Sequence, residues 1–543
     1  MKITSQECRT TRRRGSVLVT ALVVIMLLSL SVYQFSEMSL VEYELAGHRN
    51  TLLASAEAAT SGIIAVGFEA EHHRLSSELL ANAIVISGDS VRPTSFRIVP
   101  DLTVLASRST DVRRTSGVLN ESALLNLNTL PLDESERRET RDRLTQIPGI
   151  SREIADSILD WMDPDDTPSE FGAESSWYLN QKFNRLPRQA RLTHLEELLQ
   201  IRGITPELFF GEDRNGNGLP DGGDVDLNGN GRIDRGLQDY LTVTSCESAL
   251  RDDGSLKLNL NEKNLAQVYD QLSDRFGPIV ARFIVALRSA GPQKNYTQQE
   301  VLSAQEDDRK KRQETVQDRL RRQLSGSGDQ FRQNEAAAAR GGISLSENPP
   351  YQIRSLFDLI GVTVRIPVDG VDTLLHSPWT ADSSGVESAF RTLESEVTFD
   401  DSPLIFGRIN VLQAPAEVLA SVPGISPSAA ISIVRARQRF LKAESGHTRH
   451  ISPAWLVTDG LFSLEDIRTA GPYLTTGGDV FHGISLGYVA DATYAAGIWF
   501  QVDASMPPAR ITEYRHLPPI PVHRFPHVFQ STTSRPDNPL QRL

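Results

Sequence analysis

Cysteine is nearly absent from this chain, which carries Cys8 and Cys246 as its two cysteines among 543 residues. Cys8 lies in a basic N-terminal segment that we expect to be removed, and its removal would leave Cys246 without an intramolecular partner. Disulfide bonds therefore cannot hold this fold together, and cysteine content does not identify the compartment.

An excess of positive charge is also lacking, because the formal net charge is -13 at pH 7. A basic footprint supplies most of the affinity of general nucleic-acid binders, so this balance disfavours that class. The hydrophobic content of 39% and the charged content of 23% are ordinary for a globular protein and argue against wholesale disorder. The length allows two to four domains.

Catalytic signatures are missing as well. The sequence contains no phosphate-binding loop, HExxH or CxxC pattern. The adjacent pair His72 and His73 is more typical of a protein surface than of a metal site, and the later histidines stand in polar or proline-rich contexts. The sequence therefore predicts a protein that is not an enzyme.

One long apolar run lies near the N-terminus. Residues 9–14 read RTTRRR, and residues 15–36 carry no charge, which is about the ~20 residues that a membrane-spanning helix needs. The arginines should stay in the cytoplasm, so the rest of the chain faces outward. A cleaved signal peptide and a generic signal anchor are alternatives, although only weak cleavage sites follow Leu30.

An internal repeat occurs at 125–161 and 409–437, where an Asn-containing extended segment, a helix, the letters PGIS and a second helix follow one another. This spacing predicts helix-hairpin-helix units, in which Pro and Gly set the turn and Ile fills the gap between the helices. The turn residues are Pro148, Gly149, Ile150, Pro423, Gly424 and Ile425. Segments 195–209 and 353–364 are weaker relatives. Such units often bind DNA, but the run DWMDPDD after the first turn would repel phosphate, so a protein-packing role is favoured.

Residues 213–234 resemble calcium-binding loops. Carboxylate and amide side chains recur at alternate positions around a glycine, which is the oxygen-ligand spacing of an EF-hand-type loop. The candidate ligands are Asp213, Asn215, Asn217, Leu219 through its carbonyl, Asp221 and Asp224 in the first register, and Asp226, Asn228, Asn230 and Asp234 in the second. The second register lacks a closing carboxylate. A solvated Asn/Gly turn is the alternative. Residues 163–170 are a further oxygen-rich run for which calcium is conceivable.

The N-terminus resembles the class III leader of type IV pilins and pseudopilins, which is cut directly after a glycine. Here the cut would fall between Gly15 and Ser16, and methylation is a further feature that the resemblance implies. Most members carry glutamate at the fifth mature position, where this chain has Thr20, and minor pseudopilin K of type II secretion characteristically lacks it. The segment AEAA at 56–59 resembles the element that follows the pilin stem.

The outer motifs also resemble the minor pseudopilin K family in the same order. They are LNLNTL, DWMDPDD followed by GAESSWY, LEELLQIRGI and INVLQAPAEVLASVPGI. The resemblance implies an α+β fold, in which a pilin-like stem helix and a small antiparallel sheet are interrupted by a large, mostly helical domain with helix-hairpin-helix units and calcium. We expect a leader at 1–15, a membrane span at 16–38, further stem and first strands at 39–115, two helical regions at 116–292 and 346–480 around a charged insertion at 293–345, closing strands at 481–506 and a Pro-rich tail at 507–543.

The resemblance implies assembly as the function. The chain would be a single-pass protein of the bacterial inner membrane, processed by prepilin peptidase, with most of its residues in the periplasm. Its stem would pack with other minor pseudopilins, and its bulky domain would cap or initiate a pseudopilus tip for protein export, with no nucleic acid involved. The alternatives are a membrane-anchored DNA-uptake protein that uses the helix-hairpin-helix units, and a calcium-dependent adhesin.

Overall fold

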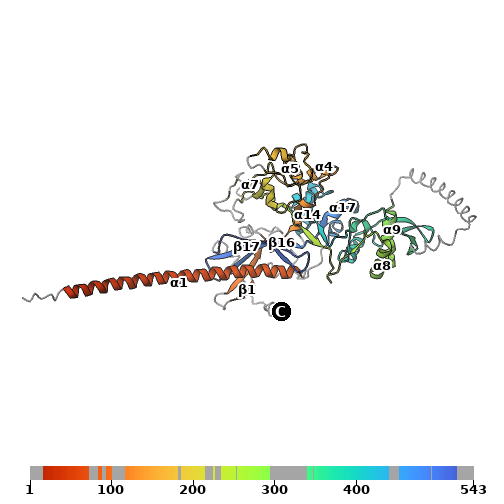
Figure 1. Cartoon of the computed structure of the whole chain (residues 1–543). Helices are drawn as coiled ribbons and strands as arrows, with labels where there is room; N and C mark the ends of the chain where they lie inside the picture. The colour runs from red at the N-terminus through yellow and green to blue at the C-terminus, as the bar shows by residue number, and fades with distance from the viewer. Residues whose placement is uncertain are drawn as a thin grey trace, which may run out of the picture.

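A single helix dominates the N-terminal part of the chain. The computed structural model describes residues 16–71, 84–87, 93–100, 117–181, 185–213, 224, 226, 234–251, 253–293, 339–345, 348–438, 452–490 and 492–522. Helix α1 covers Ser16–Glu71, and no proline interrupts these 56 residues. At 1.5 Å per residue the helix is roughly 84 Å long. In Figure 1 it extends as a rod beyond the rest of the molecule, with strands β16 and β17 along its C-terminal part.

The C-terminal part of α1 packs on an antiparallel sheet with the strand order β1-β2-β16-β17-β18. The strands are β1 (Ile84–Ser87), β2 (Thr94–Val99), β16 (Val480–Val489), β17 (Tyr494–Asp503) and β18 (Arg510–His516). Two short strands join it, since β3 (Leu119–Asn120) pairs with β16 and β19 (Ile520–Pro521) pairs with β17. Strands β1 and β2 lie within 39–115, β16 and β17 lie at 480–503, and β18 carries the sheet beyond residue 506, where we expected the tail.

The contact between α1 and the sheet selects one face of the helix. Ala58, Ala59, Ile63 and Val66 are at most 3% exposed and pack against side chains of β2 and β17. Leu53 is 62% exposed, so the buried face of α1 begins after it.

A large, mostly helical region lies between β2 and β16 in the sequence, although these two strands are hydrogen-bonded neighbours. Its first half contains α4 (Arg137–Leu144), α5 (Arg152–Met162), α6 (Ser175–Tyr178), α7 (Pro206–Phe210), α8 (Leu265–Phe276) and α9 (Pro278–Ala290). Its second half contains α12 (Ser383–Leu393), α13 (Ala416–Ala420), α14 (Pro427–Ala436), α16 (Trp455–Thr458) and α17 (Leu464–Ala470). The α+β fold with a helical insertion is thus confirmed.

Short strands and single 3-10 turns connect these helices. The strand pairs are β4 (Leu125–Asn126) with β5 (Leu241–Thr242), β6 (Cys246–Ser248) with β13 (Leu404–Phe406), β7 (Leu258–Asn259) with β12 (Val397–Thr398), β8 (Ala339–Arg340) with β9 (Ile343–Ser344), β10 (Thr363–Val368) with β11 (Val371–His376), and β14 (Ile409–Asn410) with β15 (Leu474–Thr475). The 3-10 turns are η2 (Glu121–Ala123), η3 (Leu127–Thr129), η4 (Leu195–Gln200), η5 (Leu237–Asp239), η6 (Leu356–Leu359) and η7 (Gly471–Tyr473).

Both halves of the helical region share one core. A continuous cluster of buried side chains runs from Ala123 to Leu474 and includes residues of α5, α9, α12 and α14. Cys246 is a buried free thiol, and burial raises its pKa to about 12. Most of the charged insertion expected at 293–345 lies outside the described residues.

The two PGIS segments fold alike. Gly149 and Gly424 have φ values of +82° and +84°, in the left-handed region that favours glycine. Each turn is followed by a helix whose serine N-cap accepts a hydrogen bond, and Ile150 and Ile425 are buried. The weaker relative at 353–364 differs, because its turn leads into strand β10 instead of a second helix. The helix-hairpin-helix interpretation stays a prediction.

Candidate functional site

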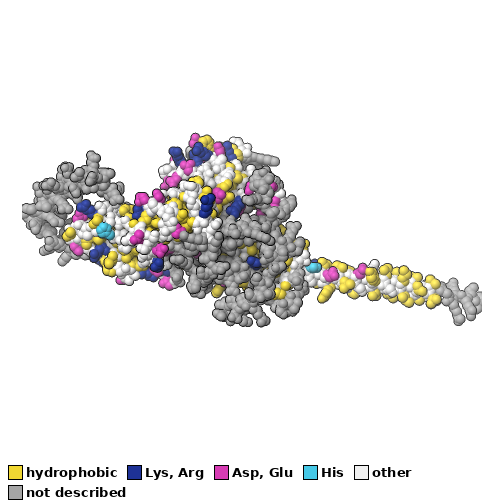
Figure 2. Space-filling view, turned by 180° about the vertical axis from the view of Figure 1, so that it is seen from behind, with side chains coloured by type: hydrophobic (Ala, Val, Ile, Leu, Met, Phe, Trp, Pro, Cys, Tyr) yellow, Lys and Arg dark blue, Asp and Glu magenta, His cyan; other side chains and the backbone are white. Residues whose placement is uncertain are grey.

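The exposed surface of α1 is the first feature that bears on function. The helix is long and apolar enough to cross a membrane. Exposed apolar side chains continue beyond residue 36, at Met38, Leu40, Val41, Tyr43 and Leu45, which are all more than half exposed. Figure 2 shows hydrophobic side chains along the projecting rod, with few charged side chains among them. An apolar surface of this length requires a membrane, a partner or both to cover it.

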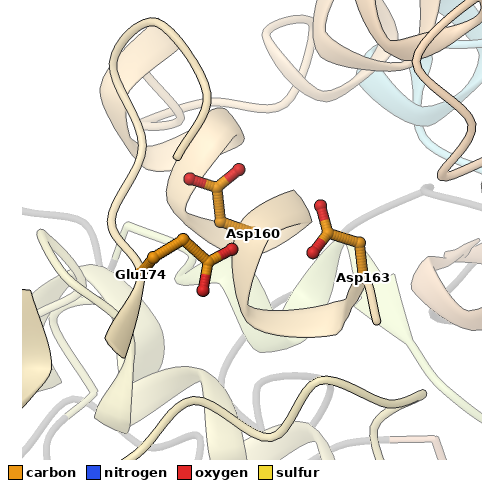
Figure 3. Close-up of side chains that lie close together, drawn as sticks. All are labelled: Asp160, Asp163 and Glu174. Carbon is orange, nitrogen blue, oxygen red and sulfur yellow. The ribbon is translucent and has the colours of Figure 1, made fainter. Parts of the chain in front are cut away.

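A cluster of buried carboxylates in the first helical half is the second feature. Helix α5 carries Asp156 and Asp160 one turn apart, and Asp163 follows at its C-cap. The chain then loops back, so that Glu174 lies opposite Asp160 and Asp163. All four carboxylates are at most 1% exposed. Figure 3 shows the side chains of Asp160, Asp163 and Glu174 facing one another.

Two arginines of α4 neutralise part of this cluster. The Arg137 guanidinium donates to Asp160 at 2.9 Å and also to Asp163, while the Arg141 Nε lies 2.5 Å from Asp156 Oδ1. Because Arg137 and Arg141 are one turn apart, they match the one-turn spacing of Asp156 and Asp160 on α5. The ion pairs therefore hold α4, which precedes the PGIS turn, against α5, which follows it.

Glu174 is the member of the cluster that the arginines do not reach. Among the described residues, neither of its carboxylate oxygens has a hydrogen-bond partner, and the same is true of Asp163 Oδ1. One oxygen from each of Asp160, Asp163 and Glu174 lies within 4.8 Å of the other two. Burial, followed by repulsion from the neighbouring carboxylates, raises the pKa of Glu174 to about 8.

The loop that carries Glu174 is held tightly against α5. Ser169 N donates to Asp160 Oδ2 at 3.0 Å, and Phe171 N donates to Asp156 Oδ2 at 3.1 Å. A Cβ atom at Gly172 would lie 1.8 Å from Asp160 Oδ2, so only glycine allows the loop to pass this close. This close approach of the loop to α5 places Glu174 beside the other carboxylates of the cluster.

The sequence did not single out Glu174. The run at 163–170 indicated oxygen ligands, but the carboxylate that completes the cluster comes eleven residues after Asp163. The available signal was the GAE segment at 172–174, since a glycine before a carboxylate allows close backbone approach.

The predicted calcium loops lie mostly outside the described residues. Asn215, Asn217, Leu219, Asp221, Asn228 and Asn230 are not described, whereas Asp213, Asp224, Asp226 and Asp234 are. The ends of the segment come together, because Gly211 and Arg235 form an antiparallel bridge and Asp234 N donates to Glu212 at 3.0 Å. The ligand assignment stays a prediction. Of the expected processing site, Gly15 is not described and Ser16 begins α1.

The arginines that follow the second PGIS turn bear on the DNA-binding alternative. Arg437 is 2% exposed, and its guanidinium donates to the carbonyl oxygens of Val411 and Ala414 at 3.1 and 2.6 Å. Arg439 lies outside the described residues, and Arg435 is exposed. Arg437 therefore serves the fold, which weakens the DNA-binding alternative.

The region that contains the carboxylate cluster is similar to a known protein family. Residues 123–210 match the family model described as protein K of the type II secretion system. The matched segment includes Asp160, Asp163 and Glu174, and also the first PGIS turn.

No curated protein matches the chain. Among solved structures, the crystal structure of the GspK-GspI-GspJ complex from the type 2 secretion system of enterotoxigenic Escherichia coli is similar at 8% identity, with a TM-score of 0.31. That alignment covers 88% of this chain and 99% of the other.

Proposed function

We propose that this chain is a minor pseudopilin that caps or initiates the tip of a type II secretion pseudopilus. The observation that carries the proposal is the combination of an exposed apolar stem with a much larger outer domain in one continuous chain. The family match of residues 123–210 to protein K supports the same assignment. The role is structural, and the partners are other minor pseudopilins in the inner membrane.

The stem supplies the surface for assembly. Residues 16–36 of α1 are charge-free and would occupy the membrane, which leaves the exposed apolar residues from Met38 to Leu45 just outside it. Side chains such as Val41, which is 55% exposed, would be covered when other stem helices pack alongside. Helix packing of this kind buries apolar area without requiring a cleft.

The fifth position of the expected mature chain favours a terminal place in the fibre. The Thr20 hydroxyl donates to the carbonyl oxygen of Val17 within α1 at 3.0 Å. A neutral side chain here cannot form an ion pair with the N-terminus of a neighbouring subunit. A subunit at the end of the fibre, with no subunit above it, would not need that ion pair. The helical region between β2 and β16 adds bulk that would block addition above the tip.

Co-purification tests this proposal. The full chain, extracted in detergent from cells that also express the other minor pseudopilins, should retain them on an affinity tag. Val41→Arg should lose them, because it places a charge in the stem contact. Ile279→Arg is the matched control, since Ile279 is 75% exposed on α9, away from the stem. Recovery of the same partners with Val41→Arg, or of none with the unaltered chain, contradicts the proposal.

Processing gives an independent test. We expect prepilin peptidase to cut between Gly15 and Ser16, so that mass spectrometry of the membrane-extracted protein finds Ser16 at the N-terminus. An intact Met1, or a start beyond residue 30, would contradict a pilin-like leader.

We also propose structural calcium in the loops at 213–234. The alternating oxygen ligands support it, as does the bridge that brings the two ends of the segment together. Replacement of Asp213 and Asp226 by asparagine should lower the amount of calcium that the protein retains after dialysis. Unchanged calcium content in this double variant would refute the assignment.

A further inference from the structure

We propose that a cavity between the two halves of the helical region binds a free α-amino acid with an apolar side chain. The cavity has a volume of about 350 Å³, which lies at the lower end of the roughly 300–1,000 Å³ that small-molecule sites occupy. It lies outside the segment 123–210 that matches protein K, and it shares no residue with the carboxylate cluster or with the loops at 213–234.

Much of the lining of this cavity is apolar. Phe357 of η6 and Phe390 of α12 are 1% and 6% exposed, and their ring centroids lie 4.8 Å apart. Further apolar lining comes from Ile353, Leu356, Val397 and Leu474. An apolar side chain of a ligand would displace water from these residues, and the burial of both surfaces would favour binding.

The charged lining is balanced in sign. Six charged side chains line the cavity, three of each sign: Lys257, Arg354 and Arg408, and Glu247, Glu394 and Asp400. Arg408 and Glu247 form an ion pair at 2.7 Å, and Lys257 Nζ donates to the backbone carbonyl oxygen of Glu394 at 3.0 Å. A ligand with a net charge would leave that charge without a counterpart in a half-buried space, whereas a zwitterion keeps the balance.

Two buried polar atoms in the lining residues point to a carboxylate. Among the described residues, Thr398 Oγ1 and Arg408 Nε have no hydrogen-bond partner, although buried polar atoms are nearly always bonded. Thr398 is 4% exposed. An arginine Nε can only donate, and a hydroxyl can donate as well, so one acceptor group would satisfy both atoms. The α-carboxylate of an amino acid is such an acceptor, and the carboxylates of the lining would balance its ammonium group.

Paired strands position the polar lining. Thr398 ends β12, which pairs with β7, and Lys257 directly precedes β7. Glu247 lies opposite Ile405 in the pair of β6 with β13, and Arg408 follows β13. These groups stand in or beside hydrogen-bonded strands, so their positions are set before a ligand arrives.

Ordered water is the competing explanation, because water can bond to the same two atoms. The two explanations differ in what the protein binds. If only water fills the cavity, the unaltered chain binds no amino acid. If the cavity is an amino-acid site, removal of the Thr398 hydroxyl weakens binding without a loss of stability, because that hydroxyl has no partner within the described protein.

Equilibrium dialysis of the full chain in detergent tests the proposal. The probes are radiolabelled L-phenylalanine and L-leucine, and detergent alone is the blank. We expect saturable binding of about one equivalent per chain of at least one probe, since one cavity holds one small ligand. 3-Phenylpropionate lacks the ammonium group and phenethylamine lacks the carboxylate, so each should compete about tenfold more weakly than L-phenylalanine.

Two variants locate the binding. Thr398→Val should weaken it about tenfold while Tm stays the same or rises. Thr392→Val is the matched control, because Thr392 is exposed on α12 and its hydroxyl donates to the carbonyl oxygen of Ser388 at 2.8 Å. Lys257→Gln should also weaken binding about tenfold, whereas Lys263→Gln, at an exposed lysine outside the cavity, should not.

Three results would overturn the proposal. The first is the absence of saturable binding of both probes to the unaltered chain, which would leave the cavity to water. The second is binding that is unchanged in folded Thr398→Val and Lys257→Gln, which would place the amino acid elsewhere. The third is competition by phenethylamine or 3-phenylpropionate that equals competition by L-phenylalanine, which would exclude recognition of a zwitterion.

Discussion

The contact between α1 and the sheet yields the sharpest quantitative prediction, at Gly487 of β16. A Cβ atom there would lie 1.9 Å from the carbonyl oxygen of Ser55, 2.3 Å from Ala59 N and 3.0 Å from the Ala58 side chain. Two of these neighbours are backbone atoms of α1, which cannot move aside by a rotamer change. Gly487→Ala would therefore push the helix away from the sheet.

The size of the effect follows from these distances. Adding one methyl group to a packed interior typically costs about 1–3 kcal/mol, and the upper end applies where backbone must shift. We expect about 3 kcal/mol for Gly487→Ala. At 1.4 kcal/mol per factor of ten, this would raise the population that opens locally by about a hundredfold.

Hydrogen exchange of the full chain in detergent measures this opening directly. Amides of α1 between residues 55 and 70 should exchange about a hundredfold faster in Gly487→Ala, while amides in α5 and α9 keep their rates. Gly483→Ala is the control on the same strand, since its Cβ would meet no atom closer than 3.2 Å. Equal protection of α1 in Gly487→Ala and the unaltered chain would refute the packing of α1 on β16.

Three further perturbations have defined outcomes. Glu121→Ala removes the acceptor for His482 at 2.7 Å in a buried site and should lower unfolding free energy by about 1–3 kcal/mol; an unchanged melt would contradict this. Burial raises the pKa of Glu394 to about 7, so its contribution to stability is present below about pH 4.5 and is lost as pH rises through 7. Glu394→Gln should therefore raise Tm relative to the unaltered chain at pH 8 more than at pH 5. Glu387→Gln in α12 is the control substitution, and an equal effect of Glu394→Gln at both pH values would contradict the prediction. Ile150→Ala in the first PGIS turn should cost about 2–5 kcal/mol, and a cost below 1 kcal/mol would contradict its burial.

Features with a strong local signal were predictable from the sequence. The apolar run of α1, the strands at 84–87 and 94–99, and the glycine turns at 149 and 424 each follow from neighbouring residues alone. A long charge-free stretch and a glycine after proline have few competing structures.

Features that depend on distant partners were not predictable. Strand β18 has seven exposed residues, so neither face gives it an alternating apolar pattern. The buried face of α1 depends on the close approach of its backbone to Gly487. That glycine lies more than 400 residues away in the sequence. Glu174 joins Asp160 only because the loop between them folds back past Gly172.

The helical region is inserted between two neighbouring strands of the sheet. This insertion explains how a mechanical force on the helical region would reach α1. The region leaves the sheet after β2 and re-enters at β16, and these strands are paired side by side. At this junction Asn120 Nδ2 donates to the carbonyl oxygen of Gly478 at 2.7 Å, and Glu121 accepts from His482 of β16 and Gln501 of β17.

Because Glu121 is 4% exposed, these bonds are not replaced by water without opening the junction. A domain tied by two chain crossings and a buried polar cluster cannot swing freely on its sheet. Force applied to the helical region would therefore pass through β16 and β17 into the packed half of α1, which is the coupling that a subunit at the tip of a growing fibre would need.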